Sequence, residues 1–259
     1  MPAPRIRTLL AAAAAAVMVA GISACAPERE SAPLHSPSPS ATSPTTPTPT
    51  PTPTVPAFDR AAHSVDDPAS IWVVVDKLRP LNPKDYVPAL VSANVPHISA
   101  PLMREEAARA IEAMFAASAA EGAGALQIQN SYRSFSVQTN THDRLVAQLG
   151  EAKADAQSAR PGYSEHQTGL VADVAALPSR CDIAQCFGQT PQGVWLAANS
   201  WRFGFILRYP ADKTAVTGYI YEPWHFRYVG VELATEMHEK GISTLEEFFG
   251  LPAAPDYAG

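Results

Sequence analysis

Residues 161–174 read PGYSEHQTGLVADV and predict a turn that leads into a buried strand. His166 and Asp173 lie seven residues apart in this run, with Gly169 between them. A charged Asp173 among apolar residues is costly to bury unless a partner group compensates it. Side chains an odd number of positions apart on one strand face opposite sides. We therefore expect a bend at Gly169, with His166 in the loop that enters the strand and Asp173 on the strand itself.

A second polar cluster lies within residues 217–230, which read TGYIYEPWHFRYVG. Glu222 and His225 are three residues apart, and the intervening Pro223 interrupts regular strand pairing. A local bend there brings both side chains to one side. Together with the upstream pair, the two clusters offer two histidines and one aspartate, and catalytic zinc has three such ligands and a fourth position for water. The alternative is an acid and a histidine paired at a sheet rim, which explains neither the inserted proline nor the upstream pair.

The rest of the pattern predicts an α+β fold with a small, mainly antiparallel sheet and flanking helices. Helices are expected over residues 101–120, near 194–200 and over 231–240, before a short LEEFF segment. Strands are expected at residues 71–75, 125–132, 169–177, 204–210 and 217–224. These runs are short and follow no regular βαβ rhythm, and no phosphate-binding glycine loop accompanies them.

The first 24 residues have the features of an export signal and are excluded from the fold. Arg5 and Arg7 precede LLAAAAAAVMVAGISA, an apolar run of 16 residues at positions 9–24. A membrane-spanning helix is the alternative, but this run is short for a hydrocarbon layer of about 30 Å. Residues 22–25 read ISAC, which resembles a bacterial lipobox. Cleavage before Cys25 and lipid attachment to its sulfur are expected, with plain secretion as the alternative.

Residues 25–57 comprise this cysteine and a linker dominated by Pro, Ser and Thr. Such a segment has little to bury and is expected to be an extended tether, and an O-glycosylated stalk fits the same composition. Residues 58–259 are expected to form one folded domain, since 259 residues with 46% hydrophobic content suffice for a substantial core. The net charge of −6 excludes a protein that grips nucleic acid by its phosphates.

The three cysteines leave one unpaired in an exported protein. With Cys25 assigned to lipid, Cys181 and Cys186 remain as a local pair in CDIAQC. Outside the cytoplasm, such a pair is expected to form a disulfide. A zinc knuckle is the alternative, but no second Cys or Cys/His pair lies nearby in the sequence to complete one.

Four stretches, SYRSFSVQ, RPGYSEHQTGLVADV, WRFGFILRYP and TGYIYEPWHFRYVG, resemble the successive motifs of VanY-type D-alanyl-D-alanine carboxypeptidases. These are zinc metallopeptidases related to lysostaphin-like enzymes and to the hedgehog domain. The resemblance spans residues 70–245 and implies an α+β fold of the hedgehog/DD-peptidase type. It implies that His166, Asp173 and His225 bind zinc and that Glu222 is the catalytic base.

The same resemblance assigns substrate contacts. Arg133 corresponds to the arginine that meets the charge of the substrate near the scissile bond, and Gln138, Ser164 and Tyr209 fall at substrate-pocket positions. The implied protein is a monomer, anchored outside the cytoplasm through Cys25, that removes the terminal D-alanine from peptidoglycan stem peptides. The sequence leaves open whether the stem is a pentapeptide (D,D) or a tetrapeptide (L,D). The alternative function is a non-catalytic, zinc-containing module that binds the cell wall.

Overall fold

The computed structural model describes residues 57–258 of the chain. The expected export signal, Cys25 and the linker as far as residue 56 lie outside the described residues. Within the described part, no helix combines the length and the apolar character needed to cross a membrane.

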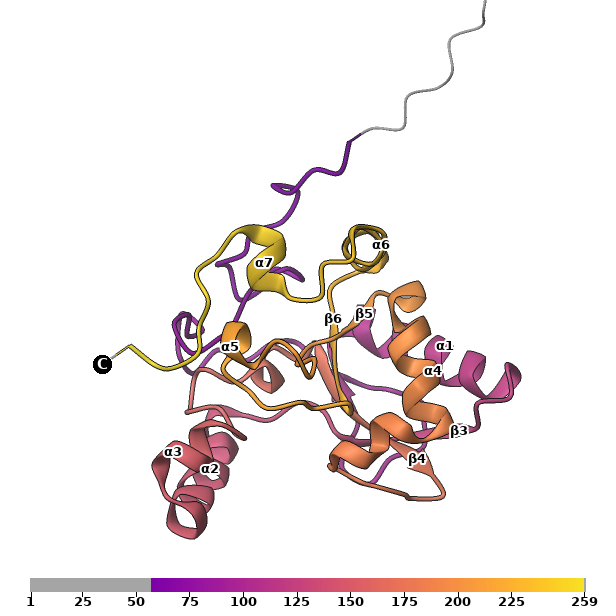
Figure 1. The fold of residues 1–259 in the computed structure, drawn as a ribbon, viewed down its shortest axis with the longest axis horizontal. Helices are drawn as coiled ribbons and strands as arrows, with labels where there is room; N and C mark the ends of the chain where they lie inside the picture. The colour runs from indigo at the N-terminus through magenta and orange to yellow at the C-terminus, as the bar shows by residue number, and fades with distance from the viewer. Residues whose placement is uncertain (1–56, 259) are drawn as a thin grey trace, which may run out of the picture. The chain divides into compact units, whose positions relative to one another are not determined.

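A four-stranded antiparallel sheet forms the centre of the domain (Figure 1). Its strands are β3 (Ala125–Asn130), β4 (Val171–Leu177), β6 (His225–Tyr228) and β5 (Phe205–Leu207), in that spatial order. A separate pair is formed by β1 (Val91–Ser92) and β2 (Leu102–Met103). The register of β4 and β6 sets Asp173 directly opposite His225. The predicted α+β class and antiparallel sheet are confirmed, and the two polar clusters of the sequence meet on adjacent strands.

Helices surround this sheet (Figure 1). They are α1 (Glu105–Ala120), α2 (Phe135–Leu149), α3 (Glu151–Asp155), α4 (Pro191–Asn199), α5 (Thr214–Thr217), α6 (Val231–Lys240) and α7 (Leu245–Phe249), with 3-10 turns η1 (Glu165–Thr168), η2 (Gln185–Gln189) and η3 (Ser200–Phe203). Figure 1 shows α1 and α4 together on one side, whereas α2 and α3 form a separate hairpin. The predicted helix over residues 231–240 is confirmed at both ends.

The main apolar core lies between α1 and one face of the sheet. Ile111 and Met114 of α1, Ile128 of β3 and Phe226 of β6 are completely buried there. Side chains alternate along a strand, so Val174 points into this core while its neighbour Asp173 points to the opposite face. Burying each such apolar side chain contributes about 1.5–3 kcal/mol. The core therefore fixes which face of β4 carries the aspartate.

Residues 71–75 lie outside any strand, contrary to the expectation. Their side chains do alternate, because Val73 and Val75 pack into the main core while Trp72 and Val74 pack into a second apolar cluster with α6 and α7. The backbone bonds, however, go to single partners: Val74 N donates to Val65 O, and Val73 O accepts from an arginine side chain. Burial on two sides thus reproduces the pattern of a strand without strand pairing.

Two further boundaries differ from the expectation. The first helix begins at Glu105, four residues later than expected, because Leu102 and Met103 pair with β1 instead. Residues 217–224 form no strand: Thr217 ends α5, and Gly218 has a left-handed φ of 80°. Strand pairing resumes only at His225, after Pro223, which has no N–H to donate.

Candidate metal centre and active site

His166 reaches the polar face of the sheet because the chain bends just before β4. It lies in η1, and Gly169 closes that turn with a φ of 72°. A side chain is disfavoured in this conformation, and an added Cβ would lie 2.8 Å from Leu90 Cδ2. The Nδ1 atom of His166 lies 2.6 Å from the carbonyl oxygen of Ser131. Nδ1 therefore carries the hydrogen and donates it, which leaves the lone pair of Nε2 for another partner.

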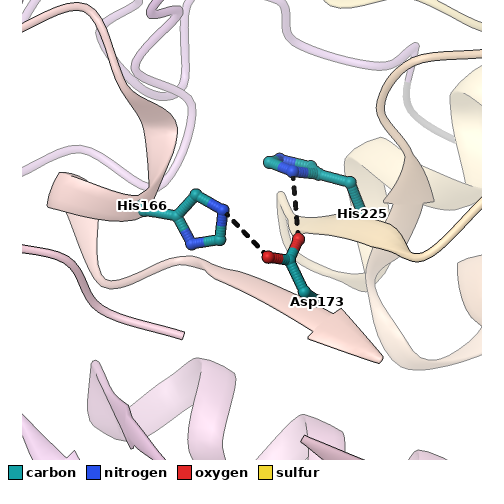
Figure 2. Close-up of side chains that lie close together, drawn as sticks. All are labelled: His166, Asp173 and His225. Atoms are coloured by element: carbon teal, nitrogen blue, oxygen red, sulfur yellow. Dashed lines mark ion pairs between the residues drawn. The ribbon is translucent and has the colours of Figure 1, made fainter. Parts of the chain in front are cut away.

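Asp173 lies between the two histidine rings (Figure 2). Its Oδ2 is 3.4 Å from His166 Nε2, and its Oδ1 is 3.4 Å from His225 Nδ1. Asn130 of β3 donates to Oδ2 at 3.1 Å. The aspartate is only 4% exposed, and both histidines are equally buried. One potential ligand atom from each of the three residues lies within 4.8 Å of the others.

The buried polar atoms of this group that lack hydrogen-bond partners are suited to bind a cation. Asp173 Oδ1 is buried and has no hydrogen-bond partner, which is unfavourable for a carboxylate oxygen unless a positive ion lies beside it. Burial acts to raise the pKa of Asp173, yet the two histidines outweigh it and hold that pKa well below its usual value. Two imidazole nitrogens and one carboxylate oxygen are a donor set typical of zinc.

Glu222 lies at the edge of the same group. Its Oε2 is 3.5 Å from His225 Nδ1, and its backbone is fixed because Glu222 N donates to Tyr209 O and Glu222 O accepts from His225 N. Burial raises the pKa of the Glu222 carboxyl to about 8, against the opposing effect of His225. A nearby divalent cation would lower this pKa again, so the carboxyl is placed to exchange protons near neutral pH.

Glu165 is a buried residue of this region that was absent from the sequence predictions. Its Oε1 accepts from Arg208 Nε at 3.0 Å and from Arg227 Nη1 at 2.7 Å, and its Oε2 lies 3.6 Å from His225 Nε2. Arg208 in turn forms a two-pronged pair with Glu246 of α7. The sequence does place Glu165 next to a metal-ligand candidate, but its partners are distant in sequence and follow no spacing rule.

The pKa of His225 depends on burial and on the acidic residues on both sides of its ring. Burial acts to lower its pKa, but Asp173 and Glu165 outweigh burial and raise the pKa to about 9. The ring therefore holds a proton that a metal ion must displace in order to bind. Because Nε2 faces Glu165 and Nδ1 faces Asp173 and Glu222, a ring that keeps hydrogen on Nε2 offers Nδ1 to the metal.

The expected substrate residues divide into two kinds. Three of them, Arg133, Ser164 and Tyr209, line the cavity that also contains the metal-ligand candidates described above. Gln138 is completely buried and is not among the residues that line this cavity. Its Oε1 accepts from Arg133 Nη1 at 2.8 Å, and its Nε2 donates to Ala159 O at 2.6 Å. Gln138 thus holds the arginine in place from behind.

The expected disulfide is confirmed. Cys181 and Cys186 are bonded, with their Cα atoms 5.6 Å apart. The ring that they close follows β4 and runs into η2, which contains Cys186, and one of its residues, Ile183, lines the same cavity. The cavity is therefore bounded by the sheet, by Thr141 and Leu145 of α2 and by this ring.

Known proteins resemble this chain in sequence and in fold. A sequence profile of the VanY family, described as D-alanyl-D-alanine carboxypeptidase, matches residues 100–231. The putative carboxypeptidase YodJ of Bacillus subtilis (strain 168) is 38% identical over 192 residues, which are 72% of this chain and 69% of YodJ. The LdcB LD-carboxypeptidase superimposes with a TM-score of 0.65 and 39% identity, over 71% of this chain and 87% of LdcB. The vancomycin-resistance D,D-pentapeptidase VanY, solved with Zn(II), superimposes with a TM-score of 0.58 and 32% identity, over 68% of this chain and 97% of that enzyme.

The fold and the buried centre together define a zinc-dependent carboxypeptidase. An acid beside a group that fits a metal ion supplies the two components that amide hydrolysis requires. The chain belongs to the VanY family of D-alanyl-D-alanine carboxypeptidases.

Proposed function

We propose that this protein removes the terminal D-alanine from peptidoglycan stem peptides, with zinc held by His166 Nε2, Asp173 and His225 Nδ1. The observation that carries the proposal is the buried group of these residues, whose carboxylate oxygen Oδ1 has no hydrogen-bond partner among the described residues. The names of the similar enzymes, an LD-carboxypeptidase and a D,D-pentapeptidase, support the choice of substrate.

Zinc, when bound, supplies a Lewis acid that polarises the scissile carbonyl and acidifies a water molecule. Glu222 is the base that takes the proton of the attacking water and returns it to the leaving amine. Burial raises its pKa and a bound cation would lower that pKa again, so the carboxyl can gain and lose a proton close to neutral pH. No side-chain nucleophile and no covalent intermediate on the enzyme are required.

Arg133 binds the negative charge of the substrate and of the transition state. Its Nη1 is fixed by Gln138, and the guanidinium lines the cavity. A planar donor held in this way can hold a carboxylate or a developing oxyanion with two parallel hydrogen bonds. Gln138 is assigned a positioning role behind Arg133, while Ser164 and Tyr209 are proposed to contact the peptide directly.

Mass spectrometry of defined muropeptides tests this function. The purified, zinc-loaded protein is incubated separately with a tetrapeptide and a pentapeptide stem, and we expect the loss of one alanine from at least one of them. Loss from the tetrapeptide is L,D activity, and loss from the pentapeptide is D,D activity. Protein that holds zinc, binds peptidoglycan and releases no alanine from either stem would instead be the non-catalytic wall-binding module.

We further propose that the enzyme is exported and acts outside the cytoplasm as a monomer. The proposed organisation is a signal peptide at residues 1–24, lipid on Cys25 with a linker through residue 57, and the catalytic domain from residue 58. The Cys181–Cys186 disulfide supports an oxidising compartment. Mass analysis of the mature N-terminus tests the anchor: a lipidated Cys25 is expected, and a soluble mature protein that begins elsewhere would contradict it.

A further inference from the structure

The loop closed by the disulfide, residues 181–186, places one apolar side chain at the cavity that contains the metal-ligand group. Ile183 lines that cavity together with Glu222, Trp224 and His225. Its side chain is 42% exposed although it is large and apolar. Of the large apolar side chains that are comparably exposed in residues 57–258, Ile183 is the one that lines this cavity.

The backbone of this loop adopts an unfavourable conformation. Ile183 has a φ of 49° and Cys181 has a φ of 57°, and these are the non-glycine residues with positive φ in the described part of the chain. A β-branched residue is a rare outlier in the left-handed region, and such outliers persist only where the surrounding structure enforces them. The disulfide encloses Ile183 in a small covalent ring and supplies part of that enforcement.

Packing on both sides of the ring supplies the rest. Phe187 directly follows the ring and is completely buried in the main core, against which Cys181 also packs. At Gly188, an added Cβ would lie 2.4 Å from Tyr221 Oη and 3.1 Å from Pro223 Cβ. The segment after the ring therefore lies tightly against the chain that carries Glu222, which anchors the loop at that end.

The order of the strands places this loop and Arg133 on different sides of the centre. Arg133 follows β3, which pairs with one edge of β4. Gly188, two residues after the ring, packs against Tyr221 and Pro223, which lead into β6 on the other edge of β4. A peptide whose terminal carboxylate meets Arg133, and whose scissile amide lies at the metal ligands, extends its preceding residues toward Ile183.

We infer that Ile183 is a specificity-determining residue that contacts the aliphatic part of the stem peptide on the acyl side of the scissile bond. The disulfide ring holds the side chain in the position for this contact. The inference rests on the proposed function, because it names a substrate contact of that same cavity. It makes the ring part of the substrate-binding surface as well as a covalent cross-link.

The test compares Ile183→Asn with Val194→Asn in the full-length, zinc-loaded enzyme. Val194 is a β-branched residue of α4 with 56% exposure, and it does not line the cavity. Ile183→Asn is expected to raise the KM for the stem peptide by roughly fivefold, as a lost apolar contact does, with kcat within about twofold. Because asparagine accepts positive φ more readily than isoleucine, its melting temperature is expected to stay level or rise. Val194→Asn is expected to leave both kinetic constants unchanged.

Two further variants keep the inference testable. Ile183→Gly removes the side chain and the strain together and is expected to raise KM in the same way. The double variant Cys181→Ser, Cys186→Ser retains Ile183 but opens the ring, and it is also expected to raise KM. An unchanged KM in both Ile183 variants would overturn the inference, whatever their stability. A wild-type enzyme that releases no alanine from either stem would instead refute the proposed function.

Discussion

Glu165 places a buried negative charge 3.6 Å from His225, one of the proposed metal ligands. Both arginines that contact this residue donate to the same oxygen, Oε1. In Glu165→Gln, the single amide oxygen is expected to remain with Arg208 and Arg227, which turns the amide NH₂ toward His225 Nε2. The amide NH₂ and a hydrogen on His225 Nε2 would then be two donors that face each other. This disfavours hydrogen on Nε2 and favours the tautomer with hydrogen on Nδ1, which cannot bind metal through Nδ1.

We therefore predict that Glu165→Gln lowers zinc affinity by about 10–100-fold, the usual effect of losing a partner that orients a ligand. Titration of zinc against a competing chelator measures this affinity directly. Glu246→Gln is the matched control, since Glu246 also pairs with Arg208 but makes no contact with the histidines in the described part of the chain. Equal affinities in the two variants would contradict the positioning role of Glu165.

Glu222 stands close enough to His225 to act as a base or as a fourth ligand. The base assignment predicts that Glu222→Gln retains zinc and its melting temperature, because the amide has nearly the same volume. Turnover is expected to fall by about a hundredfold or more, the usual scale of general acid–base catalysis. Metal analysis and alanine release are measured on the same sample. Loss of zinc from the variant would make Glu222 a ligand.

The candidate ligands could be predicted from the sequence because their residue types and spacings are specific to a metal centre. Asp173 and His225 are adjacent across two strands, and the bend at Gly169 was readable from one glycine. The charges around Glu165 could not be predicted, because Arg208, Arg227 and Glu246 lie 38–62 residues from their partners. Buried charge pairs of this kind follow from the tertiary fold and not from local spacing.

At the level of secondary structure, local signals decided which expectations were confirmed. The helix over Val231–Lys240 has a glycine on each side, and β4 is a buried run, apolar except for Asp173, that pairs with a strand on each side. The run at residues 71–75 gave the same signal as a strand, since each side is buried by a different cluster. The hydrophobic pattern of a sequence predicts which side chains are buried. It does not predict whether a neighbouring strand is available for backbone hydrogen bonding.

The α2–α3 hairpin is held by a buried polar contact. Asp155 Oδ1 lies 2.8 Å from His142 Nε2, and Asp155 Oδ2 accepts from Arg160 Nη2 at 2.8 Å. Burial acts to raise the pKa of Asp155, but these two partners outweigh it and hold the pKa below its usual value of 3.8. The hairpin leads to the segment that lines one side of the cavity.

This depressed pKa predicts an acid-dependent loss of stability. An aspartate whose pKa is lower in the folded state stabilises the fold above its unfolded pKa of about 3.9, and this contribution disappears as the pH falls through the folded value. Asp155→Asn is expected to be less stable than the wild type at pH 7 and to lose less stability below pH 4. Urea unfolding at a series of pH values measures the difference. Parallel curves for the two proteins would contradict the prediction.

For the whole domain, zinc binding and folding are coupled. The proposed ligands lie on η1, β4 and β6, so the unfolded chain has no preformed site. A ligand that binds only the folded state at a thousandfold excess over its Kd stabilises it by about 4 kcal/mol. We predict that chelation lowers the free energy of unfolding by an amount that grows with the logarithm of the zinc concentration. Stability that is independent of zinc would exclude metal binding by the folded domain.

Because the proposed ligands Asp173 and His225 face each other across β4 and β6, we expect bound zinc to affect the assembly of these strands. A shift of one residue between these strands would turn one of the two ligands to the core face, because successive side chains alternate. The ion can therefore bind fully only after the strands have found their native alignment, and it then stabilises that alignment against the shifted ones. We therefore expect zinc to favour the native alignment of β4 and β6 during folding, in addition to its proposed part in hydrolysis.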